Sequence, residues 1–349
     1  MKTLSLRELD DRKMKIAVIQ GDGIGPSVIS AAIKVLEAIS DKYGFQLDFV
    51  MTPAGDKVAE EQGEPLPKDS FLKIRDSDAC LKGPIGETAR DVIVFLRREL
   101  DLYANIRPFK SLPITPKIYR GVDFIIVREN TEDLYKGIED VGDNYAVAMM
   151  IFTRKGCERI ARIAGEMASE RRKLVTIVHK SNILDSFKFF KESCMNVLRD
   201  FDLKVEDMYV DNAAYQLIVN PMRFDVILTP NMFGDILSDE AAGIVGTLGV
   251  CPSANIGDSH GLFEPVHGAA PSIDPRYANP TATILSAAMM LEWLGKRRGD
   301  RLMTDASSEI RSSIDSVLNE GKILTPDMGG NASTMDFAEA IISRILSGN

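Results

Sequence analysis

Short runs of β-branched and apolar residues alternate with longer amphipathic stretches along most of this chain. The segment 27–43 is one such stretch, and it places Val28, Ala32, Val35, Leu36 and Ile39 on one face of a helix. Alternation of this kind predicts an α/β fold around an open, mostly parallel or mixed sheet, because parallel neighbours need long crossover connections. The runs with the composition of strands are 15–20, 46–51, 79–81, 123–127, 174–178, 204–210 and 224–229.

The chain is long enough for two domains. Its 349 residues exceed the length of a single domain of about 150 residues. A chain that is 45% hydrophobic can also bury a large core without disulfides or metal staples. The four cysteines are far apart and form no CxxC pair, which argues against a zinc knuckle or a disulfide scaffold and favours reduced thiols. No repeat or low-complexity linker marks the boundary between domains.

Charge and hydropathy exclude several classes of partner. The net charge of −9 argues against nucleic acid or an anionic membrane surface, which both attract positively charged proteins. The apolar stretch 282–294 is too short to span a bilayer and predicts a buried helix. Residues 1–13 are polar, lack the apolar segment of a signal peptide, and are expected to form a flexible lead-in. We therefore expect a cytoplasmic protein.

The sequence GDGIGP, residues 21–26, lies between the first predicted strand and the first predicted helix. The dinucleotide fingerprint G-x-G-x-x-G would need glycine where the chain has Pro26, and no acidic residue is well placed at the end of a second strand. A fold of the Rossmann type is therefore not expected. Pro26 fits the first turn of a helix instead. The turn can still lie near a ligand, because open α/β sheets bind ligands at the carboxyl ends of strands.

Asp235 and Asp239 are four residues apart and share one face if this segment is a helix. Like charges at that spacing destabilise a helix by a few tenths of a kcal/mol, and a divalent cation would reverse the sign of that effect. Carboxylate oxygens suit Mg²⁺ or Mn²⁺. The alternative is a solvated acidic face. The apolar strand that leads directly into this helix favours the metal site.

Arg97, Arg107 and Arg128 each end or follow an apolar run, where a buried guanidinium is costly without an anion. Together they could hold a substrate with two carboxylates, because the guanidinium fork matches carboxylate geometry. Each could instead be a structural ion-pair partner.

Two further segments carry candidate chemistry. Lys180, in the sequence HKSN, directly follows a predicted strand, and a lysine in such a position can act as a base when its pKa is lowered. His267, in EPVHGAAP, is surrounded by small residues that permit the close approach of a flat ligand such as adenine. The alternative for both segments is an ordinary surface loop.

Taken together, these segments resemble the β-decarboxylating dehydrogenases, the family of isocitrate, 3-isopropylmalate and homoisocitrate dehydrogenases. The resemblance covers nearly the whole chain from Met14 onward, and it implies a two-domain α/β fold of that family's own type. Nine motifs match in order: GDGIGP, LR with LYANIRP, VRENTEDLYKG, HKSN, YVDN, NMFGDILSDEAAG, PSANIGD, FEPVHGAAP and TPDMGGNAST.

The resemblance implies a role for each matching polar residue of the substrate site. Arg97, Arg107 and Arg128 would bind the two carboxylates of a 2-hydroxy-3-carboxy acid. Lys180 would take the hydroxyl proton, directly or through water, as hydride leaves C2. After loss of CO₂, Tyr135 would protonate the enolate carbon as a general acid.

The resemblance also implies a metal site and an oligomer. Asp211, Asp235 and Asp239 would hold Mg²⁺ or Mn²⁺, which would stabilise the developing enolate as a Lewis acid. Lys180 and Asp211 would reach into the site of a second subunit, so the active unit would be a homodimer or a higher homo-oligomer. The domain that carries these residues would be 103–247, and the larger cofactor-side domain would combine 1–102 with 248–349.

The cofactor expected from the resemblance is NAD, with NADP as the alternative. NAD-specific relatives carry an aspartate where this chain has Ser272, so Asp274 would have to replace it. Arg276 and Tyr277 could instead meet the 2′-phosphate of NADP. The residues expected along the cofactor are Asn182, Glu264, His267, Gly268, Ala269, Ala270, Pro271 and Asn279.

Substrate specificity in this family depends on the turn just before Arg97. Isocitrate enzymes place serine and asparagine where this chain has Asp91 and Ile93, and homoisocitrate enzymes often carry a basic residue near the position of Val94. An apolar pair at Ile93 and Val94 disfavours burial of a third carboxylate, which costs several kcal/mol unpaired. This favours 3-isopropylmalate, converted to 2-oxoisocaproate in leucine biosynthesis.

Two alternatives stay open. Arg90 could turn inward and pair with an extra carboxylate, which would admit homoisocitrate or isocitrate, or it could form an exposed ion pair with Asp91 or Glu87. Some members of the family are non-catalytic regulatory subunits that lose catalytic or metal residues. This chain keeps Tyr135, Lys180 and the three aspartates, which favours an enzyme.

Overall fold

The structure, a computed structural model, describes residues 13–347, so the lead-in expected for residues 1–13 lies almost entirely outside the described residues. The chain forms two compact units. Unit 1 contains the described residues up to Leu96 together with 248–254 and those from Ser259 onward. Unit 2 contains Arg97–Thr247 and Asn255–Asp258. Within residues 13–347, no helix combines the length and the apolar character needed to cross a membrane.

Unit 1 is built on parallel strands. The strands β1 (Lys13–Ile19), β2 (Gln46–Met51), β3 (Ala79–Lys82) and β12 (Gly261–Pro265) have the order β2-β1-β3-β12, and the pairs β1–β2, β1–β3 and β12–β3 are parallel. Their carboxyl ends therefore lie at one edge, which is followed by the GDGIGP turn, by residues 83–88 and by the segment from His267.

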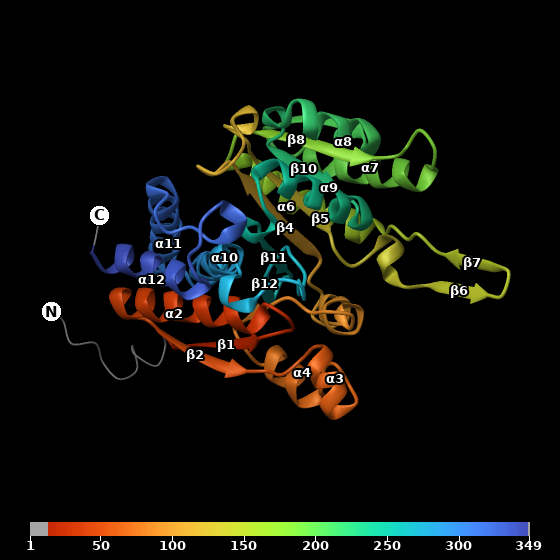
Figure 1. Ribbon diagram of the computed structural model, residues 1–349. Coiled ribbons are helices and arrows are strands. Elements are labelled where there is room, and N and C mark those ends of the chain that lie inside the picture. Colours follow the sequence, from red (N-terminus) through yellow and green to blue (C-terminus); the bar gives the residue numbers. More distant parts are fainter. Residues whose placement is uncertain (1–12, 348–349) are drawn as a thin grey trace. The chain divides into compact units, whose positions relative to one another are not determined.

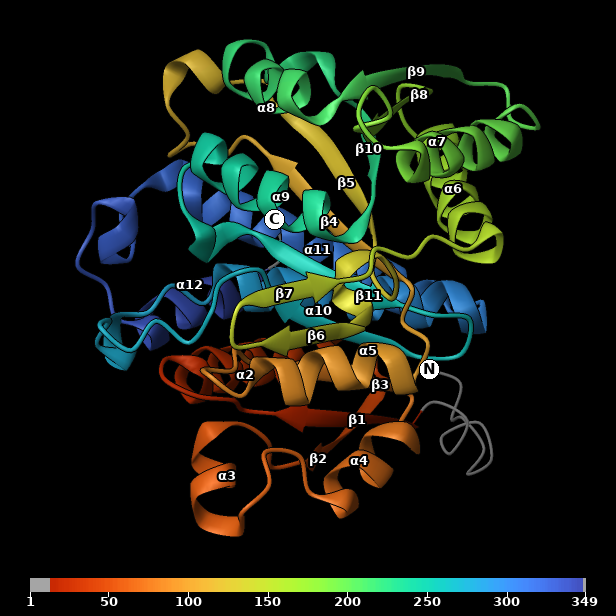
Figure 2. The same cartoon turned by 90° about the vertical axis from the view of Figure 1, so that its right-hand side faces the viewer.

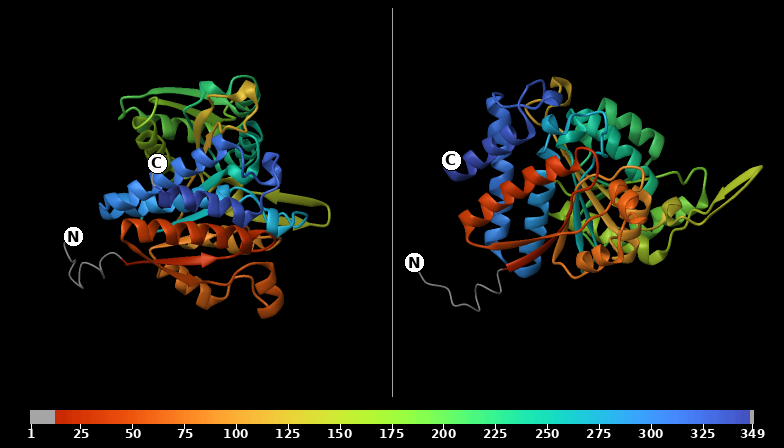
Figure 3. Two further views of the ribbon diagram at one scale, coloured as in Figure 1. Left: turned by 60° about the vertical axis from the view of Figure 1, so that its left-hand side comes forward. Right: turned by 60° about the horizontal axis from the view of Figure 1, so that its bottom comes forward.

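Helices cover both faces of these strands. The helices α2 (Gly25–Tyr43), α10 (Thr281–Arg298), α11 (Arg301–Glu320) and α12 (Thr334–Ser347) pack against one another on one face (Figure 3). The shorter α3 (Asp56–Gln62) and α4 (Lys68–Arg75) lie on the opposite side of β1 and β2 from α2 (Figure 1). The predicted helix at 282–294 is the largely buried α10.

Unit 2 is built on a mixed sheet. The strands β4 (Ala104–Lys110), β5 (Asp123–Glu129), β8 (Leu174–His179), β9 (Lys204–Tyr209) and β10 (Val226–Thr229) have the order β4-β5-β10-β8-β9, and only β4 runs antiparallel to its neighbour. The helices α6 (Arg154–Ser169) and α7 (Asp185–Leu198) cover one face, and α8 (Val210–Val219) and α9 (Asn231–Val245) cover the other (Figure 2).

This topology brings distant parts of the sequence to one edge of the unit 2 sheet. Because β5, β10, β8 and β9 are parallel, their carboxyl ends lie together, and β4 starts at the same edge. Candidate functional residues occupy or follow the ends of the parallel strands: Arg128, Lys180, Asp211 and Asp235. Arg107 lies in the middle of β4.

A two-stranded hairpin projects from the rest of unit 2 (Figure 1). It consists of β6 (Glu139–Gly142) and β7 (Tyr145–Ala148), which pair only with each other. Val141 is 72% exposed and Val147 is 54% exposed. The hairpin therefore has apolar surface that the described residues of the chain do not cover. An isolated hairpin is marginally stable in water.

The α/β class and the mostly parallel sheet predicted from the sequence are confirmed. The sequence reading missed β4, β6, β7, β12 and β11 (Pro252–Ile256), which are short or interrupted by polar residues and lack a clear alternating pattern.

Unit 2 begins at Arg97, six residues before the domain boundary that the sequence predicts at 103. In addition, residues 255–258 belong to unit 2. The physical reason is hydrogen bonding: Arg97 Nε donates to Asn255 Oδ1 at 3.0 Å and Tyr103 Oη donates to Asp258 at 2.9 Å. The short α5 (Phe95–Glu99) therefore starts in one unit and ends in the other.

Candidate active site

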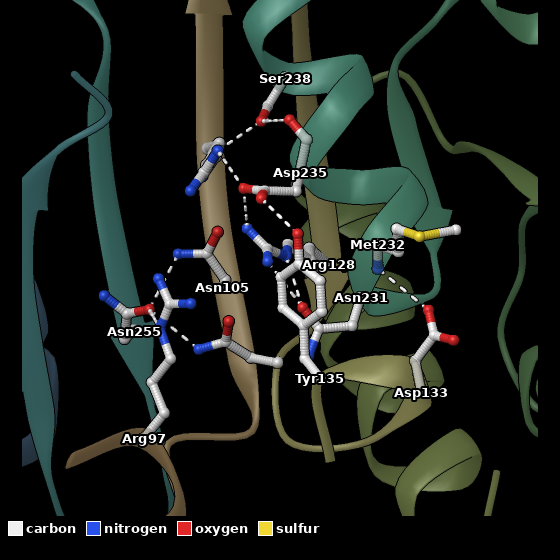
Figure 4. Close-up of polar contacts among 12 residues, drawn as sticks. Arg97, Asn105, Arg128, Asp133, Tyr135, Asn231, Met232, Asp235, Ser238 and Asn255 are labelled. Carbon is white, nitrogen blue, oxygen red and sulfur yellow. Dashed lines mark hydrogen bonds and ion pairs between the residues drawn. The ribbon is translucent and has the colours of Figure 1, made fainter. Parts of the chain in front are cut away.

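The arginine at the end of β5 is the centre of a buried polar cluster in unit 2 (Figure 4). The side chain of Arg128 is 1% exposed. Its Nε and Nη2 atoms donate to Asn231 Oδ1 at 2.9 and 2.7 Å, and Nη1 pairs with the carboxylate of Asp235. Gly234 makes this packing possible, because a Cβ atom at that position would lie 2.7 Å from Cβ of Arg128. The strand end and the helix α9 therefore meet closely at the arginine.

The other two predicted arginines approach the same cluster. Arg107, on β4, contacts Ser238 Oγ through Nη1, which is also 3.5 Å from Asp235 Oδ1. Arg97, on α5, is held by Asn255. Arg107 and Arg128 both form ion pairs with the Asp235 carboxylate, so their interpretation as structural ion-pair partners stays open beside the substrate role.

A group of asparagines, which the sequence reading missed, orients Arg97. Asn255 Oδ1 accepts hydrogen bonds from Arg97 Nε, from Asn105 Nδ2 at 3.1 Å and from Asn130 Nδ2 at 2.9 Å. All three asparagines are buried. The sequence feature that could have identified these asparagines is their position inside matched motifs: Asn105 in LYANIRP, Asn130 in VREN and Asn255 in PSANIGD.

The electrostatics of the cluster favour an added anion. Burial lowers the pKa of Arg128 to about 9, although the Asp235 carboxylate acts in the opposite direction. Burial alone would raise the pKa of Asp235, but Arg128 and Arg107 hold it below its ordinary value. Arginine remains protonated in proteins, so the guanidinium groups of Arg97, Arg107 and Arg128 are cations. A ligand carboxylate could pair with them.

Tyr135 lies on a short turn, Asp133–Lys136, and faces the cluster (Figure 4). Its hydroxyl donates to Asp235 Oδ2 at 2.8 Å, and its ring centroid is 5.3 Å from Cζ of Arg128. Burial and the nearby Asp235 carboxylate raise the pKa of Tyr135. The phenol is therefore protonated near neutral pH, as a proton donor must be.

The two aspartates of α9 form the chain's own part of the expected metal site. Asp239 is exposed and has no hydrogen-bond or ion-pair partner among the described residues, and desolvation raises its pKa. A partnerless carboxylate one turn from Asp235 suits a cation, and hard oxygen ligands suit Mg²⁺ or Mn²⁺. No group of three or more acidic, histidine or cysteine side chains in 13–347 is arranged to hold a metal ion.

Lys180 and Asp211 form a separate pair. Lys180 Nζ donates to Asp211 Oδ1 at 2.8 Å, and this hydrogen bond lowers the pKa of the Asp211 carboxyl. Neither side chain contacts Tyr135 or Asp235 in the part of the chain that the structure describes. Within one chain, the residues expected to serve the partner site therefore lie apart from the arginine cluster.

The segment expected along the cofactor packs against the GDGIGP turn in unit 1. Ile24 N–H donates to Ala269 O at 3.0 Å. Gly23 has a φ of +55°, and a Cβ atom there would lie 2.0 Å from Ala269 O, so only glycine fits this contact. The motif therefore has a packing role beside the expected cofactor segment, in place of a dinucleotide fingerprint.

His267 is buried and has one unsatisfied nitrogen. Its Nδ1 lies 3.0 Å from Gly268 O and so carries the proton, while Nε2 has no hydrogen-bond partner among the described residues. Burial lowers the pKa of His267, which keeps the ring neutral. Nε2 is then a buried acceptor that suits a donor such as the amino group of adenine. This segment fits the predicted cofactor.

The other expected cofactor residues have partners of their own. Glu264 forms a buried ion pair with Lys82 at 2.6 Å. Asn279 donates to Asp327 at 3.0 Å, and Asn182 is exposed in unit 2. The contacts expected between these residues and a nicotinamide cofactor stay predictions.

Asp274 and Arg276, the charged residues expected near the adenosine ribose of the cofactor, form an ion pair with each other. Arg276 Nη2 lies 2.6 Å from Asp274 Oδ2, and its guanidinium is 5.6 Å from the Tyr277 ring centroid. Ser272 is exposed in the same segment. The positive charge that would attract a 2′-phosphate is therefore neutralised within this loop.

The turn expected to determine the substrate is a π-helical segment, Arg90–Val94, that leads into α5. π-turns occur frequently at functional sites. Ile93 is 8% exposed, Val94 is half-buried and Arg90 is exposed.

Aspartates anchor the residues just before this turn. Asp56 accepts hydrogen bonds from Thr88 N–H at 2.8 Å, Thr88 Oγ at 2.7 Å and Glu87 N–H at 2.9 Å. Asp22 of the GDGIGP turn in turn accepts from Asp56 N–H and Gly86 N–H, each at 3.0 Å. These bonds fix segment 86–88 relative to the GDGIGP turn.

Known proteins that resemble this chain carry related names. A 3-isopropylmalate dehydrogenase of Sulfurisphaera tokodaii is 48% identical over 333 residues, which cover 95% of this chain and 98% of that protein. An isocitrate/homoisocitrate dehydrogenase of Thermus thermophilus is 46% identical over 343 residues, which cover 95% and 99%. Sequence identity of this order therefore does not by itself distinguish which substrate a member of this group uses.

The fold and the family agree with these relatives. The structure of isocitrate dehydrogenase from Methylococcus capsulatus matches with a TM-score of 0.88 and 41% identity, covering 95% of this chain and 99% of that one. The family model described as isocitrate/isopropylmalate dehydrogenase matches residues 15–341. The resemblance found in nine motifs is thereby confirmed, and this chain belongs to the isocitrate/isopropylmalate dehydrogenase family.

Proposed function

We propose that this chain catalyses the metal-dependent oxidative decarboxylation of 3-isopropylmalate to 2-oxoisocaproate, with NAD as hydride acceptor, in leucine biosynthesis. The observation that carries the proposal is the cluster of Arg97, Arg107 and Arg128 with Tyr135 and Asp235 in unit 2. It combines a site for carboxylates with a protonated phenol.

The arginines bind and orient the substrate. Their guanidinium groups match the geometry of carboxylates, and a fixed orientation is worth a large part of a reaction barrier. Asn231 supports the clamp, since its side-chain oxygen fixes two nitrogens of Arg128. Lys180 takes the hydroxyl proton, directly or through water. Tyr135 then donates its proton to the carbon that has lost CO₂.

Asp235 and Asp239 would hold Mg²⁺ or Mn²⁺, with Asp211 supplied by a second subunit. When bound, the metal would supply Lewis-acid stabilisation of negative charge on the substrate. Asp235 also pairs with Arg107 and Arg128. Substrate carboxylates at these arginines would release Asp235 to act as a ligand of the cation.

NAD would lie along the segment from His267 to Pro271. When bound there, NAD would supply the acceptor for the hydride from C2 of the acid. His267 would bind the adenine through its unsatisfied Nε2, and Asp274 would accept from the ribose 2′-hydroxyl. If Asp274 selects NAD, Asp274→Ala should raise the ratio of NADP to NAD in kcat/KM, because it removes a negative charge and releases Arg276.

The predicted substrate follows from the turn before Arg97. Ile93 and Val94 offer apolar surface for an isopropyl group and no partner for a third carboxylate. The Thermus relative named for isocitrate and homoisocitrate keeps the tricarboxylates as the second candidates. They would require Arg90, at the start of the turn, to meet the extra carboxylate.

The active unit would be a homodimer or larger homo-oligomer with shared sites. Apolar side chains that a soluble monomer would cover are exposed on unit 2: Val141, Tyr145, Val147, Tyr215, Ile218, Val219 and Ile236. Three expected metal ligands do not meet within one described chain, and Lys180 lies apart from Tyr135.

Subunit mixing tests the shared site. Lys180→Ala and Tyr135→Phe homodimers should each be nearly inactive. If Lys180 serves the partner's site, mixed dimers contain one intact site, and random mixing should restore about a quarter of wild-type activity. If both residues act within one chain, mixing restores nothing. All four cysteines are buried and none forms a disulfide within the described residues, which suits a reducing cytoplasm.

The test of the function is initial-rate formation of NADH or NADPH with Mn²⁺ and four acids: 3-isopropylmalate, homoisocitrate, isocitrate and D-malate. We expect a clear preference for 3-isopropylmalate and NAD. Preference for a tricarboxylate would overturn the assignment of Ile93 and Val94 and point to Arg90. Absence of turnover with every acid would favour a non-catalytic regulatory subunit.

A further inference from the structure

Asp133 has an unusual backbone conformation for its position. Its φ is +66°, in the left-handed region that side chains other than glycine rarely adopt, and the residue is 1% exposed. Asparagine and aspartate tolerate this region best. Backbone strain of this kind persists only where the surroundings hold it in place, and it is concentrated at functional sites. Tyr135 is two residues further along the same short turn.

The Asp133 side chain caps a helix that belongs to a distant part of the sequence. Its Oδ2 accepts from Met232 N–H at 3.0 Å (Figure 4). Its Oδ1 accepts from Leu134 N–H at 2.8 Å. Met232 is the second residue of α9, and Pro230 at the start of this helix makes no side-chain cap. The first N–H groups of a helix have no partner within it. A residue 99 positions away supplies one here.

A second bond joins the same two segments. Asn231 Nδ2 donates to the carbonyl of Glu132 at 3.2 Å, while its Oδ1 holds Arg128. The backbone N–H of Asp133 donates to Ile151 O at 2.9 Å, which secures the other side of the turn. The turn is therefore attached to the first residues of α9, and one turn later α9 presents Asp235 to the Tyr135 hydroxyl.

We propose that Asp133 is a positioning residue that fixes Tyr135 against α9, through its strained backbone and its bond to Met232. This rests on the proposed function, in which Tyr135 is the proton donor. Both features are needed: the left-handed residue turns the chain so that Tyr135 faces α9, and the carboxylate sets the distance between the turn and the helix. Displacement of a reacting group by about 1 Å can cost a hundredfold in rate.

Three substitutions separate the two features. Asp133→Asn tolerates the left-handed backbone and can keep its one side-chain oxygen as the acceptor for Met232 N–H, while the local bond from Leu134 N–H is lost. Because the bond to α9 is kept, kcat should stay within about threefold of wild type. Asp133→Gly relieves the strain but removes the acceptor. Asp133→Ala removes the acceptor and adds strain. For the last two, kcat should fall roughly 30-fold while KM changes less than about threefold, because the arginines that bind substrate are untouched.

A matched control removes a helix cap elsewhere. Asp300 caps α11, where its carboxylate accepts from Leu302 N–H at 2.9 Å, and α11 carries none of the site residues. Asp300→Ala should lower the thermal midpoint by a similar amount and leave kcat unchanged. An equal fall in kcat for Asp300→Ala would mean that general destabilisation, and not the position of Tyr135, explains the result.

A double-mutant cycle gives the sharper readout. In a Tyr135→Phe background, Asp133→Ala should have almost no further effect on kcat, because the group that it positions is absent. If the two losses multiply, Asp133 does not act through Tyr135 and the proposal is wrong. Wild-type kcat for Asp133→Gly would also overturn it.

Hydrogen exchange tests the attachment without any substrate. Asp133→Ala should raise amide exchange in peptides covering 131–137 and 231–236, and Asp133→Asn should raise it much less. Unchanged exchange in Asp133→Ala would refute the attachment. If wild-type protein oxidises none of the acids, the proposed function fails, and this measurement still decides whether Asp133 holds the turn to α9.

Discussion

Replacement of Asp235 by asparagine tests the electrostatic account of the site. The Asp235 carboxylate pairs with Arg128 and lies 3.5 Å from Arg107. Asparagine keeps the shape and a hydrogen-bond acceptor but removes the charge. Two buried guanidinium groups then lose their shared anion, so the variant should be less stable.

The size of the loss can be bounded from the structure. One ion pair at about 4 Å near a protein surface is worth about 4 kcal/mol, and removal of one partner of a buried pair typically costs about 3–5 kcal/mol. The Asp235 side chain is 38% exposed, so water screens part of this interaction. We expect a loss of about 2–4 kcal/mol in the free energy of unfolding, or about 4–8 °C in the thermal midpoint.

Ligand binding to the same variant should change in opposite directions. Mn²⁺ affinity should fall at least about tenfold, because a charged ligand is lost. Affinity for a dicarboxylate dianion without metal should rise, because Asp235 no longer competes for Arg107 and Arg128. Thermal unfolding and isothermal titration measure these three quantities.

Asp239→Asn is the matched control. Asp239 is exposed and has no partner among the described residues, so its loss should change stability by less than about 0.5 kcal/mol. It should nevertheless weaken Mn²⁺ binding. Asp235→Asn protein with a wild-type thermal midpoint and unchanged Mn²⁺ affinity would refute both the electrostatic account and the metal assignment.

Three further predictions concern other parts of the site. Tyr135→Phe should lower kcat about 10²–10⁴-fold with nearly unchanged substrate affinity, and a large loss of affinity in a binding titration would remove Tyr135 from its acid role. Gly23→Ala should weaken NAD binding and destabilise unit 1, because its Cβ would meet Ala269 O at 2.0 Å; wild-type affinity by fluorescence titration would contradict this. Asp56→Ala should cost about 1–2 kcal/mol at pH 7. Burial acts to raise the pKa of Asp56, but the hydrogen bonds from residues 87–88 hold the pKa below its ordinary value. The contribution of Asp56 to stability is therefore present above about pH 4 and lost below it. Urea melts of wild type and variant that differ in stability by the same amount at pH 7 and pH 3 would contradict this.

Much of the fold follows from local patterns in the sequence. The strand at 46–51 has the predicted ends, and the helix predicted at 27–43 begins only two residues earlier. The helix carries a long periodic run of apolar residues, which it buries on one face. β4 and β12 were missed because polar residues needed by the site, such as Arg107 and Glu264, interrupt their apolar pattern.

The sequence by itself determined which residue types were available to the site and in what order, because nine motifs place arginines, tyrosine, lysine and aspartates at fixed positions. It could not determine which of them meet. The tertiary structure decided that Arg128 and Asp235, 107 positions apart, share one cluster, and that Lys180 pairs with Asp211 away from it.

The residues that orient the site's side chains could not be identified from the sequence either. Asn255 orients Arg97 and Asp133 caps α9, yet neither has a chemical signature in the sequence that separates it from other buried polar residues. Their roles depend on the order of strands in unit 2, which brings loops from distant parts of the chain to one sheet edge. Sequence patterns report the periodicity of each element, whereas contacts between elements depend on topology and packing, which only the folded chain specifies.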